Sequence, residues 1–312
     1  MREYMPTISV LMSVYNETKS ELSTSIDSIL NQTYQNFEFI IVNDNPQNNL
    51  IREIINSYAK QDERIKAIFN EQNIGLAASL NKAASVAIGE YYLRMDADDI
   101  SELHRIERQL RKIKEYDYDL VCSDYYFIDE NGNLLDREVK IFNNDNIIRM
   151  LPKQNVIHHP TVLMKSKVFH DLNGYRNFPC AQDYDLWLRM VANKYTIHMI
   201  PEKLLYYRIR KNSITGKNKL KQMQTIKYIR MIFKDYQKTG IDQYNYSNYI
   251  DFLKKVEDEK TIRDFDNYYS VYQEGLGNIK NKRIIEGLKK VIPIIIRSKY
   301  FRLRILEKIK FF

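Results

Sequence analysis

Asp96, Asp98 and Asp99 lie within four positions of one another, directly after Arg94 and the apolar residues 91–93. Carboxylates this close repel one another unless they share a positive charge. Hard divalent cations such as Mg²⁺ and Mn²⁺ are commonly held by one or two carboxylates, with substrate phosphates completing the coordination. The spacing therefore indicates a cation site that handles a phosphorylated substrate. The alternative is an acidic start to the helix that follows.

A second acidic pair, Asp183 and Asp185, lies among the apolar residues Leu186, Leu188 and Met190. Asp183 can begin a helix, where the helix dipole would stabilise its carboxylate. A carboxylate can instead act as a general base that takes a proton from an attacking hydroxyl group. An aspartate of ordinary pKa is already ionised at pH 7 and needs no further tuning for that task. Both interpretations, helix start and base, stay open at this point.

An alternation of apolar strands and amphipathic helices is expected to position these residues. Residues 8–14 form a continuous apolar run, which is typical of a strand buried on both faces. Further strands are expected at 37–42, 65–69 and 91–95, separated by apolar residues at helical spacing. This order predicts a parallel, doubly wound α/β sheet. The helices between the strands are expected near residues 22–30, 50–59 and 76–88.

The second half of the sheet is expected to be mixed. A helix at 106–113 and a strand at 120–128 precede a turn sequence at 129–133, which predicts a hairpin. The last expected strand covers residues 204–210, and from residue 217 onward Gly and Pro are rare and apolar residues recur at helical spacing. The expected organisation is thus a catalytic α/β domain in residues 1–215 and a helical extension in residues 216–312.

Polar residues follow the first two expected strands as well. Tyr15 and Asn16 come after the first strand, and Asp44 comes after the second. In open α/β sheets ligands bind beyond the carboxyl ends of the strands, so these side chains and the three aspartates should share one edge. Asp44 either forms a turn or accepts a hydrogen bond from a nucleoside. The sequence has no Gly-x-Gly-x-x-Gly after the first strand and no Walker lysine, which argues against a dinucleotide cofactor or a P-loop ATPase.

Composition is that of an ordinary globular protein. Hydrophobic residues make up 44% and charged residues 28% of the 312 positions. The chain begins without an apolar signal segment, and the aliphatic run at 294–296 is far shorter than the roughly 20 residues of a membrane span. Cys122 and Cys180 lack the spacing of metal ligands and suit a reducing cytosol. We therefore expect a cytoplasmic protein.

Positive charge is concentrated near the end of the chain. Residues 280–312 contain eleven Lys or Arg and two Glu, a net charge of +9, whereas the other 279 residues carry −1. Residues 294–312 show no clean apolar face on a helical wheel, so electrostatic attraction to anionic lipid is the expected mode of membrane contact. The prediction is peripheral contact at the inner face of the plasma membrane. The alternative is a packed helical extension or a homodimer contact with a basic exterior.

Seven short segments occur along the chain in a fixed order. They are Ser-Val-Leu-Met-Ser-Val-Tyr-Asn (9–16), Ser-Ile-Leu-Asn-Gln-Thr-Tyr (28–34), Ile-Val-Asn-Asp-Asn (41–45), Asn-Ile-Gly-Leu-Ala-Ala-Ser-Leu-Asn (73–81), Met-Asp-Ala-Asp-Asp (95–99), Gln-Asp-Tyr-Asp-Leu-Trp-Leu-Arg (182–189) and Tyr-Arg (207–208). In this order they closely resemble the family 2 glycosyltransferases. The resemblance covers about residues 6–215 and does not include the helical extension.

The resemblance implies a GT-A fold and an inverting glycosyltransferase. The donor would be a nucleotide-sugar, with a UDP-sugar as the first expectation. The acceptor would be a glycan or a lipid-linked saccharide of bacterial surface polysaccharide synthesis. By the same resemblance, Asp44 would accept a hydrogen bond from the nucleotide base and Tyr15 would lie along the nucleoside. Arg94 would approach the donor phosphates.

The resemblance also assigns the two groups of aspartates. Asp96, Asp98 and Asp99 would form the D-x-D site that binds Mg²⁺ or Mn²⁺ beside the ribose and diphosphate, and Asp183 would be the catalytic base. This division is chemically consistent, because a metal can stabilise the departing diphosphate while one carboxylate deprotonates the acceptor hydroxyl.

One position departs from the family pattern. Many relatives have Tyr-Arg-x-His at the last strand, whereas this chain has Tyr207, Arg208, Ile209 and Arg210, followed by Lys211. Arginine is a donor that is always charged, so it cannot replace histidine as a metal ligand. We expect Arg208, Arg210 or Lys211 to pair with the donor phosphates. The alternative is a basic strand end at the surface.

Three other classes of protein would explain only some of these sequence features. A non-catalytic protein that binds sugar nucleotides or carbohydrates on the same fold would not need both the D-x-D aspartates and Asp183. A nucleic-acid-binding protein would explain the basic tail, but the excess charge is confined to one end and no recognised reading module occurs, so no nucleic-acid partner is expected. A nucleotidyltransferase would share the metal site but leaves Asp183 without a role.

Overall fold

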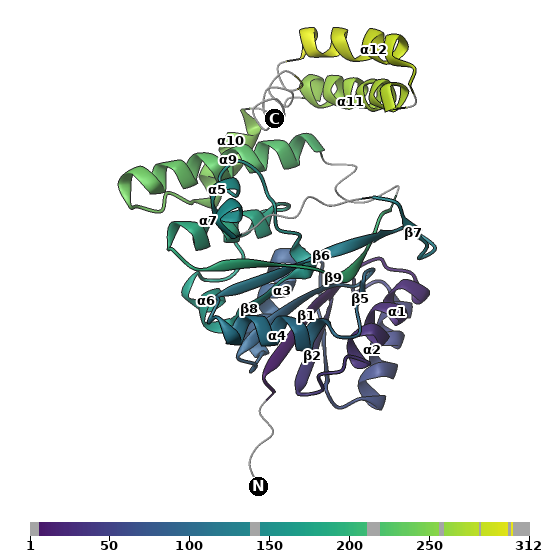
Figure 1. Cartoon of the computed structure of the whole chain (residues 1–312), viewed down its shortest axis with the longest axis vertical. Coiled ribbons are helices and arrows are strands. Elements are labelled where there is room, and N and C mark those ends of the chain that lie inside the picture. Colours follow the sequence, from purple (N-terminus) through teal and green to yellow (C-terminus); the bar gives the residue numbers. More distant parts are fainter. Residues whose placement is uncertain are drawn as a thin grey trace. The chain divides into compact units, whose positions relative to one another are not determined.

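The computed structural model describes residues 6–137, 144–210, 219–255, 259–280, 282–298 and 301 (Figure 1). The chain packs as two compact units, the first comprising Met1–Lys217 and Thr225–Gln243 and the second Asn218–Gln224 and Tyr244–Phe312. The expected role of Lys211 and the wheel analysis of the last eleven residues, 302–312, lie outside the described residues.

Nine strands form one sheet in the described part of the first unit. Their bounds are β1 (Ile8–Val14), β2 (Phe37–Asn43), β3 (Ile65–Phe69), β4 (Tyr91–Asp96), β5 (Ile100–Ser101), β6 (Leu120–Ile128), β7 (Leu134–Leu135), β8 (Leu163–Lys165) and β9 (Ile197–Arg208). The order across the sheet is β3-β2-β1-β4-β8-β6-β9-β5, and β7 pairs with β6.

The first four strands in this order confirm the expected parallel half of the sheet. β1 pairs in parallel with both β2 and β4, and β2 pairs in parallel with β3. In this register Val14 lies opposite Asn43, and Ser13 lies opposite Asp96. The polar residues that follow β1, β2 and β4 therefore share one edge of the sheet, as predicted.

The second half is mixed, as expected, but contains a strand that the sequence did not reveal. β8 is antiparallel to both β4 and β6, while β6 and β9 run parallel. At three residues, β8 is too short to give a periodic signal. β9 begins at Ile197, seven residues earlier than expected, because His198, Pro201 and Lys203 interrupt its apolar pattern.

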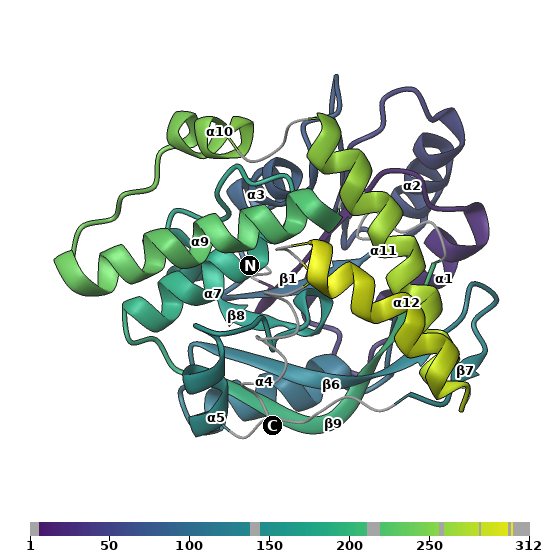
Figure 2. The same ribbon diagram turned by 90° about the horizontal axis from the view of Figure 1, so that it is seen from above.

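Helices cover both faces of the sheet in the first unit (Figures 1 and 2). Side chains of α1, α2 and α4 pack in one core with Ile8, Val10 and Met12 of β1, while α3 packs against β1 and β2 from the other side. This two-sided cover explains why most residues of β1 are apolar. The helices are α1 (Lys19–Leu30), α2 (Asn49–Gln61), α3 (Leu76–Val86), α4 (Arg105–Glu115), α5 (Asn144–Met150), the 3₁₀ helix η1 (His159–Thr161), α6 (Ser166–Asp171) and α7 (Gln182–Ala192), with the later part of α9 (Lys219–Thr239).

The second unit is helical, as the sequence predicts. It contains the start of α9 together with α10 (Tyr246–Lys254), α11 (Glu259–Lys280) and α12 (Ile284–Arg297). α11 and α12 lie side by side (Figures 1 and 2), and their close approach depends on glycine, because a Cβ on Gly287 would lie 2.5 Å from the carbonyl oxygen of Gly275. None of the helices in the described residues is long and apolar enough to cross a membrane.

Gly89 provides a test of how tightly β1 and β4 are joined. A Cβ at this position would lie 2.5 Å from the backbone nitrogen of Ser9 and 2.7 Å from the carbonyl carbon of Ile8. We expect Gly89→Ala to lower the free energy of unfolding by about 1–3 kcal/mol, because backbone must move to admit the methyl group. Chemical denaturation followed by circular dichroism measures this change.

The matched control is Gly277→Ala in α11, where an added Cβ meets no atom within 4 Å. This variant should be neutral or stabilising by about 0.5–1 kcal/mol, because alanine is the better helix former. Equal destabilisation by both substitutions would contradict the close packing described for Gly89.

Candidate active site

The acidic loop, residues 96–99, lies where β4 ends at the carboxyl edge of the sheet. Asp99 is completely buried, and Asp96 and Asp98 are each about one-quarter to one-third exposed. Burial and the neighbouring Asp96 charge raise the pKa of Asp98 to about 7, and the same causes raise the pKa of Asp99 well above its usual range. The loop thus concentrates negative charge where little water can screen it.

Each aspartate of the loop has a different partner. Asp96 forms an ion pair with Arg94 on β4. Asp98 Oδ2 lies 3.0 Å from Arg210 Nε, and Asp99 Oδ1 accepts a 2.9 Å hydrogen bond from the backbone N–H of Arg208. Asp99 Oδ2 is buried and has no hydrogen-bond partner among the described residues. The three carboxylates therefore do not point into one shared coordination sphere.

The residues of this loop suit a cation that the substrate helps to hold. Within the described ranges, no group of three or more His, Cys, Asp and Glu side chains is arranged to hold a metal ion. Mg²⁺, however, is usually bound by one or two carboxylates together with substrate phosphates. Asp98 has the like charges of Asp96 and Glu17 nearby, so its surroundings would favour such a cation. The predicted metal roles of Asp96, Asp98 and Asp99 stay predictions.

Arg208 ties the acidic loop to the hairpin turn before β7. Its Nε donates a 2.7 Å hydrogen bond to the carbonyl oxygen of Asp98. Its Nη1 donates to the carbonyl oxygens of Asp129 (3.1 Å) and Glu130 (3.0 Å). The guanidinium is thus directed at backbone carbonyls, which gives Arg208 a structural task beside the phosphate contact that the sequence predicts.

Arg210 lies between two carboxylates from different elements. Besides Asp98, it pairs with Glu21 Oε2 of α1 at 3.1 Å. Glu21 is fixed by a capping box, because its Oε2 accepts 2.8 Å hydrogen bonds from the backbone N–H and the hydroxyl of Thr18. Sequence reasoning missed Glu17 and Glu21 as neighbours of this site. The pattern Thr-x-x-Glu signals only the start of a helix.

The nucleoside end of the predicted site contains Asp44 and Tyr15. The buried Asp44 carboxylate accepts hydrogen bonds from Asn70 Nδ2 (2.8 Å) and from the backbone N–H groups of Ile74 and Gly75 (both 2.9 Å). It therefore fixes the start of α3 in addition to any ligand that it contacts. Tyr15 is exposed at the end of β1. Its carbonyl oxygen accepts a 2.9 Å hydrogen bond from Asn45, which joins the ends of β1 and β2.

Asp183 lies in the first turn of α7, where the helix dipole favours a carboxylate. Its Oδ2 accepts a 2.8 Å hydrogen bond from Asn155 Nδ2. Burial raises the pKa of Asp183, and the hydrogen bond from Asn155 and the charge of Arg94 oppose that rise. The residue before the helix, Ala181, has a left-handed backbone (φ 59°), an uncommon conformation for alanine that sets the direction in which α7 starts.

Arg94 connects the two groups of aspartates electrostatically. It pairs with Asp96 and also lowers the pKa of both Asp99 and Asp183. The pKa of Tyr175 is raised by burial and, to a smaller extent, by Asp183 and Asp96. Two groups of acidic residues that are 84 or more positions apart in the sequence therefore act on the same neighbours.

Two adjacent histidines, His158 and His159, lie within the electrostatic influence of Arg94 and contact different partners. His158 stacks on Tyr125 at a centroid distance of 4.3 Å and meets Tyr207 edge-on at 4.2 Å. His159 Nε2 lies 2.7 Å from the hydroxyl of Tyr175. Burial lowers the pKa of His158 to about 4, so this ring is neutral at pH 7.

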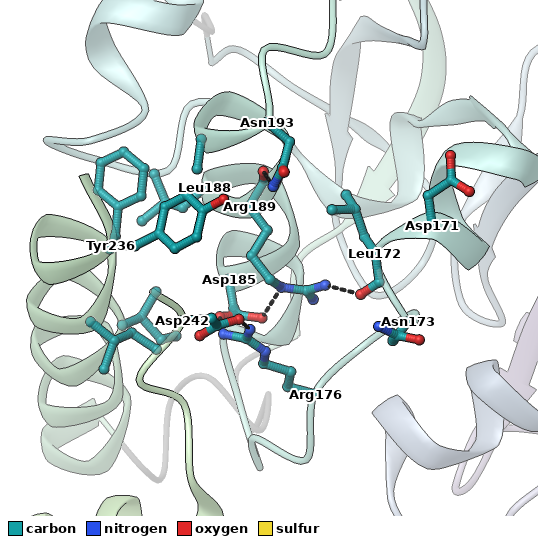
Figure 3. Close-up of a pocket in the computed structure, with 14 residues that line it drawn as sticks. Asp171, Leu172, Asn173, Arg176, Asp185, Leu188, Arg189, Asn193, Tyr236 and Asp242 are labelled. Carbon is teal, nitrogen blue, oxygen red and sulfur yellow. Dashed lines mark hydrogen bonds and ion pairs between the residues drawn. The ribbon is translucent and has the colours of Figure 1, made fainter. Parts of the chain in front are cut away.

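A charged cluster behind α7 fixes the helix that carries Asp183 (Figure 3). Asp185 pairs with Arg189 Nε at 2.8 Å and with Arg176 Nη1 at 3.2 Å, and Arg176 also pairs with Asp242. Arg189 Nη2 donates a 2.8 Å hydrogen bond to the carbonyl oxygen of Gly174. The four charged residues of this cluster line a cavity of about 280 Å³ between α7 and α9. Asp183 and Asp185 thus have separate surroundings although only one residue lies between them.

Comparison with known proteins identifies the family. The sequence model of the family "Glycosyl transferase family 2" matches residues 9–172. The chain is 44% identical over 207 residues to an uncharacterized glycosyltransferase of Methanocaldococcus jannaschii, covering 65% of this chain and 71% of that one. It is 35% identical over 223 residues to the O-antigen biosynthesis glycosyltransferase WbnJ of Escherichia coli, covering 71% of this chain and 86% of WbnJ.

The fold also matches solved structures. The structure of S. aureus TarS 1-349 in complex with UDP superimposes with a TM-score of 0.58 at 16% identity, covering 79% of this chain and 69% of that one. A complex of the same protein with UDP-GlcNAc gives a TM-score of 0.58. The protein belongs to family 2 of the glycosyltransferases and has the GT-A fold.

Asp185→Asn tests the anchoring of α7. Asp185 is 2% exposed, and its loss as a carboxylate would remove the counter-ion that the largely buried Arg176 and Arg189 share, although Arg176 would keep Asp242. We expect a loss of about 3 kcal/mol in stability, because breaking a buried ion pair is costly, and a Tm lower by roughly 6–12 °C. Differential scanning calorimetry measures it.

The control for this variant is Asp171→Asn, which breaks the exposed 2.6 Å pair between Asp171 and Lys167 on α6. An exposed pair contributes about 0–1 kcal/mol, so the Tm should change little. If Asp185→Asn changed the Tm as little as the control, the charged cluster would not stabilise α7.

Proposed function

We propose that the protein is an inverting, metal-dependent glycosyltransferase that moves a sugar from a UDP-sugar to a hydroxyl group of a glycan or lipid-linked acceptor. The observation that carries this proposal is the position of Arg94, which acts on the acidic loop and on Asp183 together. The names of two relatives support the setting, since they refer to O-antigen and teichuronic acid biosynthesis. The UDP and UDP-GlcNAc bound by TarS support the choice of donor.

Asp183 is the proposed general base. Its carboxylate would accept the proton of the acceptor hydroxyl as that oxygen attacks the anomeric carbon from the side opposite the departing diphosphate. The raised pKa makes the ionised carboxylate a stronger base than a solvent-exposed aspartate. Asn155, which donates to Oδ2, holds the carboxylate in place. A single attack of this kind inverts the configuration of the sugar.

The other site residues are proposed to bind the donor. Asp44 and Tyr15 would contact the base and the nucleoside, and Arg94 and Arg210 would approach the diphosphate. Asp98, with Asp96 or Asp99, would hold Mn²⁺ or Mg²⁺, which supplies a Lewis acid that stabilises the negative charge of the leaving group. Because Arg208 is hydrogen-bonded to three carbonyl groups, we assign it to positioning the loop and Arg210 to the phosphates.

We further propose contact with an anionic membrane, through α12. Two apolar stripes run along this helix: Gly287, Val291 and Ile294 are buried, whereas Ile285 and Ile292 are 72% and 48% exposed. Leu288 is exposed on the same stripe as these two isoleucines, because positions three and four apart share a helix face. An exposed apolar stripe of this kind is typical of a helix that lies in a membrane interface.

Basic residues beside the stripe favour a bilayer over a second copy of the chain. Lys282, Lys289 and Arg297 are exposed on or next to α12. Each such residue contributes about 1 kcal/mol of attraction near an anionic leaflet. A symmetric contact between two copies would bring like charges together around the stripe. Contact with the inner face of the plasma membrane would place the enzyme beside a lipid-linked acceptor.

Asp183→Asn tests the proposed catalysis. We expect the rate of sugar transfer to fall by about 10²–10⁴, because general base catalysis contributes that much, while the Kd for UDP with Mn²⁺ stays the same. Initial rates with UDP-GlcNAc, UDP-Glc and UDP-Gal and isothermal titration calorimetry with UDP measure the two quantities. Full activity of the variant would refute the base, and failure of all UDP-sugars to bind the wild type would refute the donor class.

The pH profile gives an independent readout of the same carboxylate. Activity should fall as the pH is lowered through the raised pKa of Asp183, because the protonated carboxyl group cannot accept a proton. Asn155→Ala removes a hydrogen bond that lowers this pKa, so the acidic limb of kcat/KM should move to higher pH. A limb that stays unchanged would assign it to another group.

Ile285→Asp/Ile292→Asp tests the membrane contact. We expect at least about a tenfold loss of binding to phosphatidylglycerol vesicles at low salt, because burying each isoleucine contributes about 1.5–3 kcal/mol. Ile241→Asp, at an exposed isoleucine of the first unit, is the control and should bind like the wild type. Wild-type protein that does not sediment with these vesicles, or that elutes as a dimer whose mass drops in the double variant, would refute the proposal.

A further inference from the structure

Arg210 lies next to a carboxylate that is also proposed to bind the metal ion. Its guanidinium lies 3.0 Å from Asp98 Oδ2 through Nε and 3.1 Å from Glu21 Oε2 through Nη2. Both nitrogens are buried, yet among the described residues neither has an aligned hydrogen-bond acceptor. Charge attraction, and not hydrogen-bond geometry, holds the side chain there. Such an arrangement can change partners at little cost.

The same carboxylate is the one proposed to hold the metal ion. A divalent cation binds a carboxylate oxygen at about 2.0–2.1 Å in the case of Mg²⁺. A guanidinium 3.0 Å from the same oxygen would repel that ion strongly in a site with little water. Asp98 can therefore accept Arg210 or the metal ion at Oδ2, but not both in this geometry.

The local charge explains why a cation is needed here when no donor is bound. Glu17, Asp96 and Asp98 act on one another electrostatically, and Arg210 is the cation that opposes this repulsion at both Glu17 and Asp98. Arg94 is already paired with Asp96. Glu21 keeps a fixed position in its capping box, so it can retain one side of the guanidinium when the other side leaves Asp98.

We propose that Arg210 is an internal counter-ion that occupies Asp98 in the donor-free enzyme and moves to the donor diphosphate when nucleotide and metal ion bind together. This inference rests on the proposed function, since it requires a diphosphate donor and a metal ion. It predicts that the two ligands are coupled: the metal ion binds poorly to the enzyme alone and better in the presence of nucleotide. Arg210 thus links the binding of the metal ion to the binding of the donor.

Mn²⁺ binding measured by electron paramagnetic resonance tests this inference without relying on catalysis. Wild-type protein is titrated with Mn²⁺ with and without saturating UDP, and Arg210→Ala and Arg210→Gln are treated in the same way. We expect UDP to tighten Mn²⁺ binding to the wild type by about tenfold or more, within the usual range of coupling between two ligands. Without UDP, both variants should bind Mn²⁺ about tenfold more tightly than the wild type, because Asp98 is then free of the guanidinium.

The affinity for UDP gives the second half of the test. In the presence of Mn²⁺, both variants should bind UDP about tenfold more weakly, because the diphosphate loses one charged partner. Arg137→Ala is the matched control, since Arg137 is exposed and lies over the ring of Phe127, so its loss should change neither affinity. Thermal unfolding of every variant verifies that it is folded, and Arg210→Gln keeps the size of the side chain if Arg210→Ala does not fold.

Three results would overturn the inference. Donor-free wild type and variants that bind Mn²⁺ equally would show that Arg210 does not compete for Asp98. Unchanged UDP affinity in the variants would show that Arg210 does not reach the diphosphate. Wild type that binds UDP-sugars and transfers sugar in EDTA would show that Arg210 replaces the metal ion altogether. The first two results leave the proposed glycosyl transfer intact, whereas the third removes its metal dependence.

Discussion

The repulsion among buried carboxylates at the end of β4 is the constraint on which the site depends. Arg94 on β4 pairs with Asp96, Arg210 just beyond β9 pairs with Asp98, and the backbone N–H of Arg208 donates to Asp99, which together make the three carboxylates tolerable there. β9 pairs with β6 and lies far from β4 in the sequence. The mixed half of the sheet therefore contributes to the electrostatics of the acidic loop as well as to its scaffold, because the end of β9 adds positive charge to that of Arg94 on β4.

The two aspartates at the start of α7 lie close together in the sequence but have different surroundings in the structure. Asp185 faces Arg176 and Arg189 in a buried cluster, whereas Asp183 faces Asn155 and the field of Arg94. Residues two apart on a helix point in nearly opposite directions. The buried cluster fixes the helix, and the fixed helix holds Asp183 beside Asn155. The stability of α7 and the chemistry proposed for Asp183 are thus separable by mutation.

The apolar residues of α12 in the helical unit are divided between a buried and an exposed stripe. α12 is apolar over a broad arc, and from the sequence alone such an arc predicts a helix packed in a core. The buried stripe of α12 consists of Gly287, Val291 and Ile294, whereas Ile285 and Ile292 stay in contact with solvent. The wheel of residues 294–312 could not reveal this surface, because the helix begins ten residues earlier and ends at Arg297.

The sequence was enough to predict the elements with strong periodicity, the parallel order of the first four strands, the helical character of the last third and the family. Local residue patterns carry these features, because continuous apolar runs and helical spacing act over a few neighbouring positions. The side chains that meet one another follow from the packing of the whole fold. In the structure the short β8 lies between β4 and β6, Arg208 donates to carbonyl groups, and Glu21 of α1 pairs with Arg210. Contacts between residues nearly two hundred positions apart depend on how the layers pack, and no local pattern encodes that distance.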